Sequence, residues 1–124
     1  MLNLTFSNLE HARVLTKAAF RASERLGIDQ SNLSQLFEID AARMLLLSSG
    51  QGVFDSGKPE WSHAIALVMC YSTLCILLGD DDSINIAAWM SSHNFDLGKV
   101  PIQLLKEANG IKQLQQFLSN VRFF

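Results

Sequence analysis

The stretch PEWSHAIALVMCYSTLCILL, residues 59–78, decides the fold of this chain. Pro59 suits the first turn of a helix, and the next residue that ends helices is Gly79. The second half of the stretch is apolar on nearly every side, as in a helix buried at the centre of a fold or shared with a partner subunit. Its longest apolar run, Ala64–Leu78, is shorter than a membrane span and includes polar residues. The stretch therefore predicts a central core helix.

The composition of the 124 residues favours an all-α chain around that helix. Apolar residues make up 48% of the chain, which is enough for a core. Ten basic against twelve acidic side chains give no surplus for neutralising phosphates, so DNA binding has to be argued from a motif. Cys70 and Cys75 lie too far apart around a helix to be bridged. With no signal peptide evident, we expect a cytoplasmic protein with reduced thiols and no membrane contact.

The residues before the central helix are expected to form three further helices. The first runs from about Leu9 to Leu26 and ends at Gly27. Its apolar side consists of Val14, Leu15, Ala18, Ala19 and Ala22. Two short helices follow, the first capped by Asp29 or Ser31 and ending at Phe37, the second running from about Asp40 to Ser48 with Gly50 behind it.

These two short helices resemble the helix-turn-helix of Xre/Cro-type proteins. Positions that such proteins keep as Gln, Leu, Ala, Leu, Val and Gly hold, in this chain, Gln30, Leu33, Ser34, Phe37, Ile39 and Gly50. Together with Met44, the apolar members are expected to hold the two helices at an angle. The turn position that is usually glycine is Glu38, which is a departure from the motif.

The second helix of the motif is a poor reader of base edges. It reads AARMLLLSS from Ala41 to Ser49, with leucines where polar side chains are usual. Its apolar outer face is expected to pack against another helix or subunit. The candidate DNA-binding residues are Gln30, Ser31, Arg43 and Ser48.

The Gly-rich segment Gly50–Pro59 predicts a connection between a helix-turn-helix region, residues 1–55, and a second helical region, residues 56–124. Part of it, Gly52–Lys58, spells most of a phosphate-binding loop. A helix rather than a strand precedes it, however, and Pro59 replaces the Ser or Thr that would bind magnesium. We interpret it as a linker.

The C-terminal third is expected to hold three shorter helices around a polar loop. The acidic run Asp80–Asp82 is typical of a helix N-terminus rather than of a cation site. Between the first two helices lies the loop His93–Val100. The helices are expected to end at Trp89, to run from Pro101 to near Gly110, and to run from Ile111 to Val121.

No group of residues proposes a catalytic or metal site. The histidines, His11, His63 and His93, lack metal-ligand spacing, and the first two are expected at the surface. Neither cysteine has an activating base beside it in the sequence, and no serine lies in a nucleophile elbow. The chain is expected to bind a partner, without a cofactor, a metal or an enzymatic activity of its own.

The C-terminal third resembles the corresponding part of Xre/MbcA/ParS-type antitoxins, and the helix-turn-helix before it completes that family's arrangement. The middle region contributes Lys58, Trp61, Tyr71, Leu74, Gly79 and Asp80 to the likeness. The most specific residues are Trp89, His93, Asn94, Leu97, Gly98, Pro101, Leu104, Gly110, Ile111, Leu118 and Arg122.

This resemblance implies a RES-domain toxin as partner, an enzyme that consumes NAD in the bacterial cytoplasm. It also implies a homodimer that covers the active-site cleft of the toxin and represses its own operon through the N-terminal motif. The toxin-binding residues would be Trp89, His93, Asn94, Leu97, Gly98, Lys99, Pro101 and Arg122, with Phe123 and Phe124 near them.

The alternative is a DNA-binding transcriptional regulator whose C-terminal domain serves dimerisation. The run of leucines after Met44 and the acidic pI of about 5.8 favour the antitoxin. Two departures leave the choice of toxin open. Lys99 stands where the family usually has a second glycine, and Met69 and Ser72 stand where many relatives have arginines.

Overall fold

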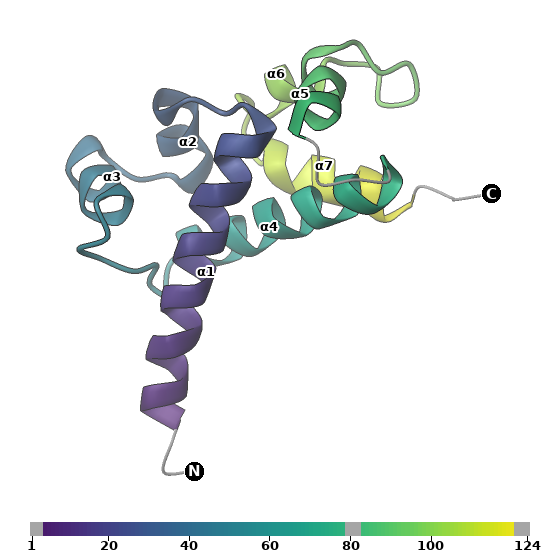
Figure 1. The fold of residues 1–124 in the computed structure, drawn as a ribbon. Coiled ribbons are helices and arrows are strands. Elements are labelled where there is room, and N and C mark those ends of the chain that lie inside the picture. Colours follow the sequence, from purple (N-terminus) through teal and green to yellow (C-terminus); the bar gives the residue numbers. More distant parts are fainter. Residues whose placement is uncertain (1–3, 79–82, 121–124) are drawn as a thin grey trace.

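The expected all-α fold is confirmed in the computed structural model, which describes residues 4–78 and 83–120 (Figure 1). These residues form seven helices and no strand, and a single isolated bridge joins Asn94 to Lys99. The helices are α1 (Leu4–Leu26), α2 (Gln30–Phe37), α3 (Ala41–Ser48), α4 (Pro59–Leu77), α5 (Ser83–Ser91), α6 (Pro101–Leu104) and α7 (Gly110–Ser119).

The central position expected for α4 is confirmed by its packing. It contacts α1, α2 and α7, and its buried face includes Ala64, Leu67, Cys70 and Leu74. By length and composition alone, α4 is also the one helix of the described residues that could cross a membrane. A core helix passes the same test, and this one packs against three neighbours.

His63 corrects an expectation, because the structure buries it on α4 rather than exposing it. Only 5% of the residue is accessible, and its Nε2 atom lies 3.6 Å from Oε2 of Glu38. Desolvation by this burial lowers the pKa of His63 from its ordinary value, although Glu38 acts in the opposite direction. Its spacing of four residues from Leu67 and seven from Cys70 places it on the buried stripe, a signal that the sequence already contained.

α1 is longer than expected, and the buried residues described on it begin at Ala12. It begins at Leu4 rather than Leu9, and its first turns project away from the other helices (Figure 1). Ala19 and Ala22 are buried as expected, but Val14 is 66% exposed because it lies off the buried stripe of the helix, which runs through Ala12, Thr16, Ala19, Ala22 and Leu26.

The two short helices, α2 and α3, pack together around buried apolar residues, as expected. Asp29 caps α2 and Asp40 caps α3, each by accepting a hydrogen bond from a backbone N–H of the first turn. Leu33, Phe37 and Met44 are buried, as the motif predicts. The turn between the helices contains a left-handed residue even without glycine, because Glu38 adopts φ 60° and ψ 48°.

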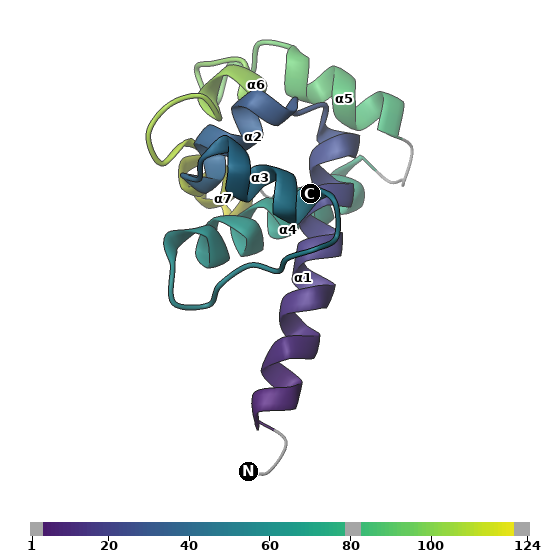
Figure 2. The ribbon, with the colours of Figure 1, turned by 90° about the vertical axis from the view of Figure 1, so that its left-hand side faces the viewer.

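The linker, residues 50–58, folds onto α1 instead of lying free. It passes alongside α1 before it reaches α4 (Figure 2). The backbone N–H of Phe54 donates to Oγ1 of Thr16 over 3.1 Å, and the Phe54 ring stacks on Phe20 at 6.2 Å and meets Phe37 edge-on at 4.9 Å. The buried residues therefore form one cluster that runs from α1 to α7 across both regions of the sequence.

The expected helix from Pro101 to Gly110 is wrong in its length. α6 ends at Leu104, a series of turns follows, and Gly110 opens α7 instead of ending α6. Asn109 takes a left-handed conformation with φ 57°, and a Cβ on Gly110 would lie 2.0 Å from the carbonyl oxygen of Leu104. The Asn-Gly pair is a sequence signal for a turn. Glycine is required at position 110 because the backbone of Leu104 leaves no room for a Cβ.

Candidate functional site

The loop between α5 and α6 is closed by hydrogen bonds to a single residue, Asn94. Its backbone N–H donates to the carbonyl oxygen of Lys99 over 3.0 Å, and its own carbonyl accepts from Gly98 over 2.7 Å. Its side-chain Oδ1 accepts the backbone N–H of Leu97 over 2.9 Å. Asn94 therefore holds the loop in one shape, and its side-chain oxygen is occupied in doing so.

Four other residues of the expected toxin-binding group also support the loop. Gly98 has φ 80°, which glycine adopts without strain. Pro101 is buried at the first position of α6. Trp89, on α5 before the loop, and Leu97, within the loop, are partly buried and pack against the core. These four residues were expected to contact the toxin, whereas their positions in the structure give them the role of supporting the loop.

The side chains that the loop presents to solvent are a smaller set. His93 is exposed, and its ring lies edge-on to that of Phe95 with 5.0 Å between the ring centroids. Phe95 is 91% exposed, the largest value among the exposed apolar residues of the described chain. Asp96 and Lys99 are exposed beside them. An aromatic pair on a fixed loop is suited to entering a cleft of another protein.

Phe95 was missed by the sequence analysis. Its signal is a phenylalanine placed directly between two polar residues, Asn94 and Asp96, in a loop. Hydrophobic periodicity does not register a single residue in a polar loop, because that method looks for repeats.

Lys99, which replaces the family's usual second glycine, forms an ion pair rather than projecting freely. Its Nζ lies 2.8 Å from Oε1 of Glu107, and the two side chains are 45% and 48% exposed. Such exposed pairs contribute little to stability. The pair nevertheless links the loop to the turns after α6, so it restricts where this charge points.

Part of the expected site lies outside the described residues. Arg122, Phe123 and Phe124 belong to this part, as does the acidic run Asp80–Asp82 that was expected to cap α5.

The described residues contain no group of three or more His, Cys, Asp and Glu side chains that could hold a metal ion. Of the two cysteines, Cys70 is buried, and burial raises the pKa of its thiol to about 12. A thiol with so high a pKa is a poor nucleophile near neutral pH.

The chain matches no protein-family model, and no curated protein matches it significantly in sequence.

The candidate DNA-binding residues of α2 lie at its exposed N-terminus. Gln30 and Ser31 are both exposed there. The carboxylate of Asp29, however, already caps this helix terminus by accepting a hydrogen bond from the N–H of Asn32 over 2.8 Å. A carboxylate in this place disfavours a phosphate at the same helix terminus.

Arg43 points into the protein and binds Glu60 at the start of α4. Its Nη2 and Nε atoms donate to the two carboxylate oxygens over 2.6 and 3.4 Å, and Nη2 also donates to the carbonyl of Val53 over 2.8 Å. Glu60 is 2% exposed, and it also accepts the backbone N–H of Asp55. The hydrogen bond that Arg43 donates to the Glu60 carboxylate raises the pKa of Arg43. The position of Arg43 makes it a clamp between α3, the linker and α4.

The outer face of α3 is apolar, as the sequence analysis expected. Leu45 and Leu46 are 68% and 44% exposed, whereas Ser48 is exposed but donates to the carbonyl of Leu45. This face offers hydrocarbon where base edges would need hydrogen-bonding groups.

Proposed function

We propose that this chain is an antitoxin of a type II toxin–antitoxin system, which binds and blocks a RES-like, NAD-consuming toxin without catalysis of its own. The observation that carries the proposal is the fixed loop with its exposed aromatic tip. Asn94, Leu97 and Gly98 supply the frame, and Phe95 and His93 supply the contact. The resemblance of this segment to Xre/MbcA/ParS-type antitoxins supports the choice of partner.

Inhibition would follow from occlusion of the toxin's substrate cleft. The Phe95 side chain enters the cleft, and the ion-paired Lys99 limits the angle at which the loop docks. Because the loop is closed in the free protein, little conformational entropy is lost on binding. The hydrogen bonds of Asn94 already hold the loop in one conformation, so the loop needs no rearrangement before it binds the toxin.

The same proposal includes a homodimer. It is supported by exposed apolar side chains outside the loop, namely Leu45 and Leu46 on α3 and Ile65, Met69 and Ile76 on one face of α4. Sedimentation of the purified protein across a range of concentrations tests this part separately.

The test of the main proposal is co-expression with a RES-like toxin encoded beside this chain. We expect wild-type protein to restore growth and to co-purify with the toxin. Phe95→Ala should weaken the complex by about tenfold to a hundredfold, as truncation of a central aromatic contact does. Val14→Ala is the matched control, because it removes an exposed apolar side chain (66%) from α1, away from both the loop and the apolar face assigned to the dimer, and it should bind within about twofold of wild type.

Failure of the wild-type chain to rescue growth or to co-purify would refute the proposal. An equal loss of affinity in both variants would instead assign the contact to a surface other than the loop.

The alternative function, a DNA-binding regulator, is tested with a duplex from the chain's own promoter. Gln30→Ala is the proper variant, because Gln30 is exposed, whereas Arg43→Ala breaks an internal clamp and would reduce binding through unfolding. Salt-sensitive binding that Gln30→Ala weakens would support the regulator.

A further inference from the structure

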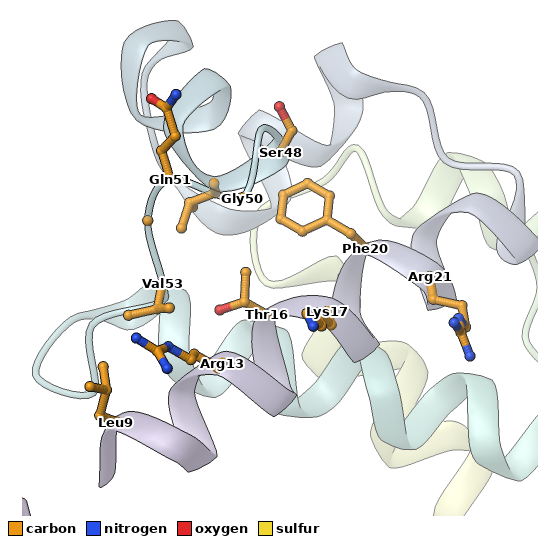
Figure 3. A pocket seen from close by; sticks show the side chains of 12 residues that line it. Leu9, Arg13, Thr16, Lys17, Phe20, Arg21, Ser48, Gly50, Gln51 and Val53 are labelled. Atoms are coloured by element: carbon orange, nitrogen blue, oxygen red, sulfur yellow. The ribbon is translucent and has the colours of Figure 1, made fainter. Parts of the chain in front are cut away.

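A groove of about 600 Å³ lies between α1 and the segment that runs from the end of α3 into the linker (Figure 3). Its floor is apolar and includes Phe20, Leu47 and Val53. Phe20 projects from α1 toward this segment, and its ring is fixed by stacking on Phe54 at 6.2 Å and by an edge contact with Phe37. A groove of this size with a fixed apolar floor is suited to apolar side chains of a ligand.

One edge of this α1–linker groove carries a row of cations. Arg13, Lys17 and Arg21 follow one another at four-residue spacing on α1, which places them on one side of the helix at steps of about 6 Å. All three are exposed, and none forms an ion pair within the described part of the chain. The acidic residues of α1, Glu10 and Glu24, are not among those that line the groove.

The charge of the groove is therefore the reverse of that of the whole chain. The formal net charge is −2, yet the residues that line the groove include three cations and no carboxylate. A local excess of this kind attracts and orients an oppositely charged partner.

We propose that the α1–linker groove binds an acidic amphipathic helical segment of a partner protein. The apolar face of the segment lies on Phe20, Leu47 and Val53, and its carboxylates lie along the row of Arg13, Lys17 and Arg21. The row spans about 12 Å, so about two turns of a bound helix are in contact with it. Anchors at i, i+3, i+4 and i+7 are the usual pattern of a helix bound in a groove.

The apolar floor favours a peptide over a nucleic acid. Nucleic-acid affinity comes mainly from many phosphate contacts, and specificity comes from polar groups that reach base edges. This groove offers three cations around hydrocarbon, and the adjacent outer face of α3 presents Leu45 and Leu46. The groove shares no residue with the loop at His93–Val100, so the inference does not depend on the antitoxin proposal.

The test measures fluorescence anisotropy of a labelled peptide mixed with the full chain at low salt. The probe is a helical peptide of about four turns, with leucines at i, i+3, i+4 and i+7 and glutamates beside them. We expect saturable binding. The double variant Lys17→Glu/Arg21→Glu should weaken it about tenfold or more, since each reversal replaces an attraction by a repulsion.

Two further variants separate charge from hydrophobic contact. Lys106→Glu is the matched control: Lys106 is an exposed lysine outside the groove, and binding should stay within about twofold of wild type. Val53→Ser removes apolar surface from the floor and should weaken binding about threefold or more. Thermal unfolding followed by circular dichroism establishes that each variant is folded.

Three results would overturn the inference. The first is no binding of the peptide by the folded wild-type chain. The second is equal binding of a peptide with the same glutamates but with serines in place of its leucines, which would reduce the groove to a charged surface. The third is displacement of the peptide by a DNA duplex that Lys17→Glu/Arg21→Glu no longer binds, which would assign the row of cations to phosphates.

Discussion

Replacing Arg43 by alanine is expected to lower the free energy of unfolding by about 3 kcal/mol. The substitution removes two hydrogen bonds to Glu60 and one to the carbonyl of Val53. It leaves a carboxylate that is 2% exposed with only the backbone N–H of Asp55 as a partner. The cost comes mainly from that stranded charge, since the pair itself is offset by the desolvation of both groups.

The size of this loss in stability follows from the exposed fractions of the two side chains, Arg43 and Glu60. Breaking a fully buried ion pair costs about 3–5 kcal/mol. The side chain of Arg43 is 27% exposed, so water partly screens the pair and the lower end of that range applies. In a chain of this length, such a loss should lower the melting temperature by roughly 10 °C.

Urea unfolding followed by circular dichroism measures this change. Arg21→Ala is the matched control, because Arg21 is an exposed arginine without an ion pair in the described residues, and it should change the stability by less than about 0.5 kcal/mol. The double variant Arg43→Met/Glu60→Leu should regain much of the loss, because it leaves no buried charge. An Arg43→Ala protein as stable as wild type would refute the reasoning, as would a double variant less stable than the single one.

Three further outcomes are expected in unfolding experiments. Gly110→Ala should lower the free energy of unfolding by about 3 kcal/mol or more, because the new Cβ would lie 2.0 Å from a backbone oxygen. Gly57→Ala, in a more open position, should cost far less, and equal losses of stability in the two variants would contradict the prediction. Glu38→Gly should stabilise the protein by about 0.5–1 kcal/mol by relieving a left-handed conformation, and a loss of stability would refute that assignment. Burial holds the pKa of His63 below its ordinary value of 6.5, so the stability that neutral His63 contributes is complete above pH 6.5 and is lost as the pH falls toward the lower folded-state pKa. His63→Gln should therefore flatten the decline in stability between about pH 7 and pH 5. An unchanged slope of stability against pH would refute this prediction.

Local features of the fold were predictable from sequence because their causes lie within a few residues. Asp29 and Asp40 cap the helices that directly follow them, and Pro59 and Pro101 each open the helix that contains them. The exposure of Leu45 and Leu46 on α3 likewise followed from the pattern within one helix.

Features that depend on distant contacts were not predictable in the same way. Arg43 read as a possible DNA contact because its partner, Glu60, lies 17 residues away and meets it only after the linker folds back. The close approach of Gly110 to Leu104 depends on how the chain turns after α6. In the candidate site, the sequence pointed to the loop His93–Val100, but it did not separate the residues that shape the loop from those that face solvent.

The closure of that loop has a consequence for how partner choice can change over generations. The hydrogen bonds that close it join Asn94 to Leu97, Gly98 and Lys99, and the Lys99–Glu107 pair links it to the turns after α6; Phe95 and Asp96 take no part in these bonds. Under the proposed function, substitutions at these two positions would therefore change the surface that the partner contacts, while the free energy of folding would stay nearly constant. Binding specificity can therefore change at Phe95 and Asp96 through variants that still fold. A substitution at Asn94 would be selected against because it destabilises the loop.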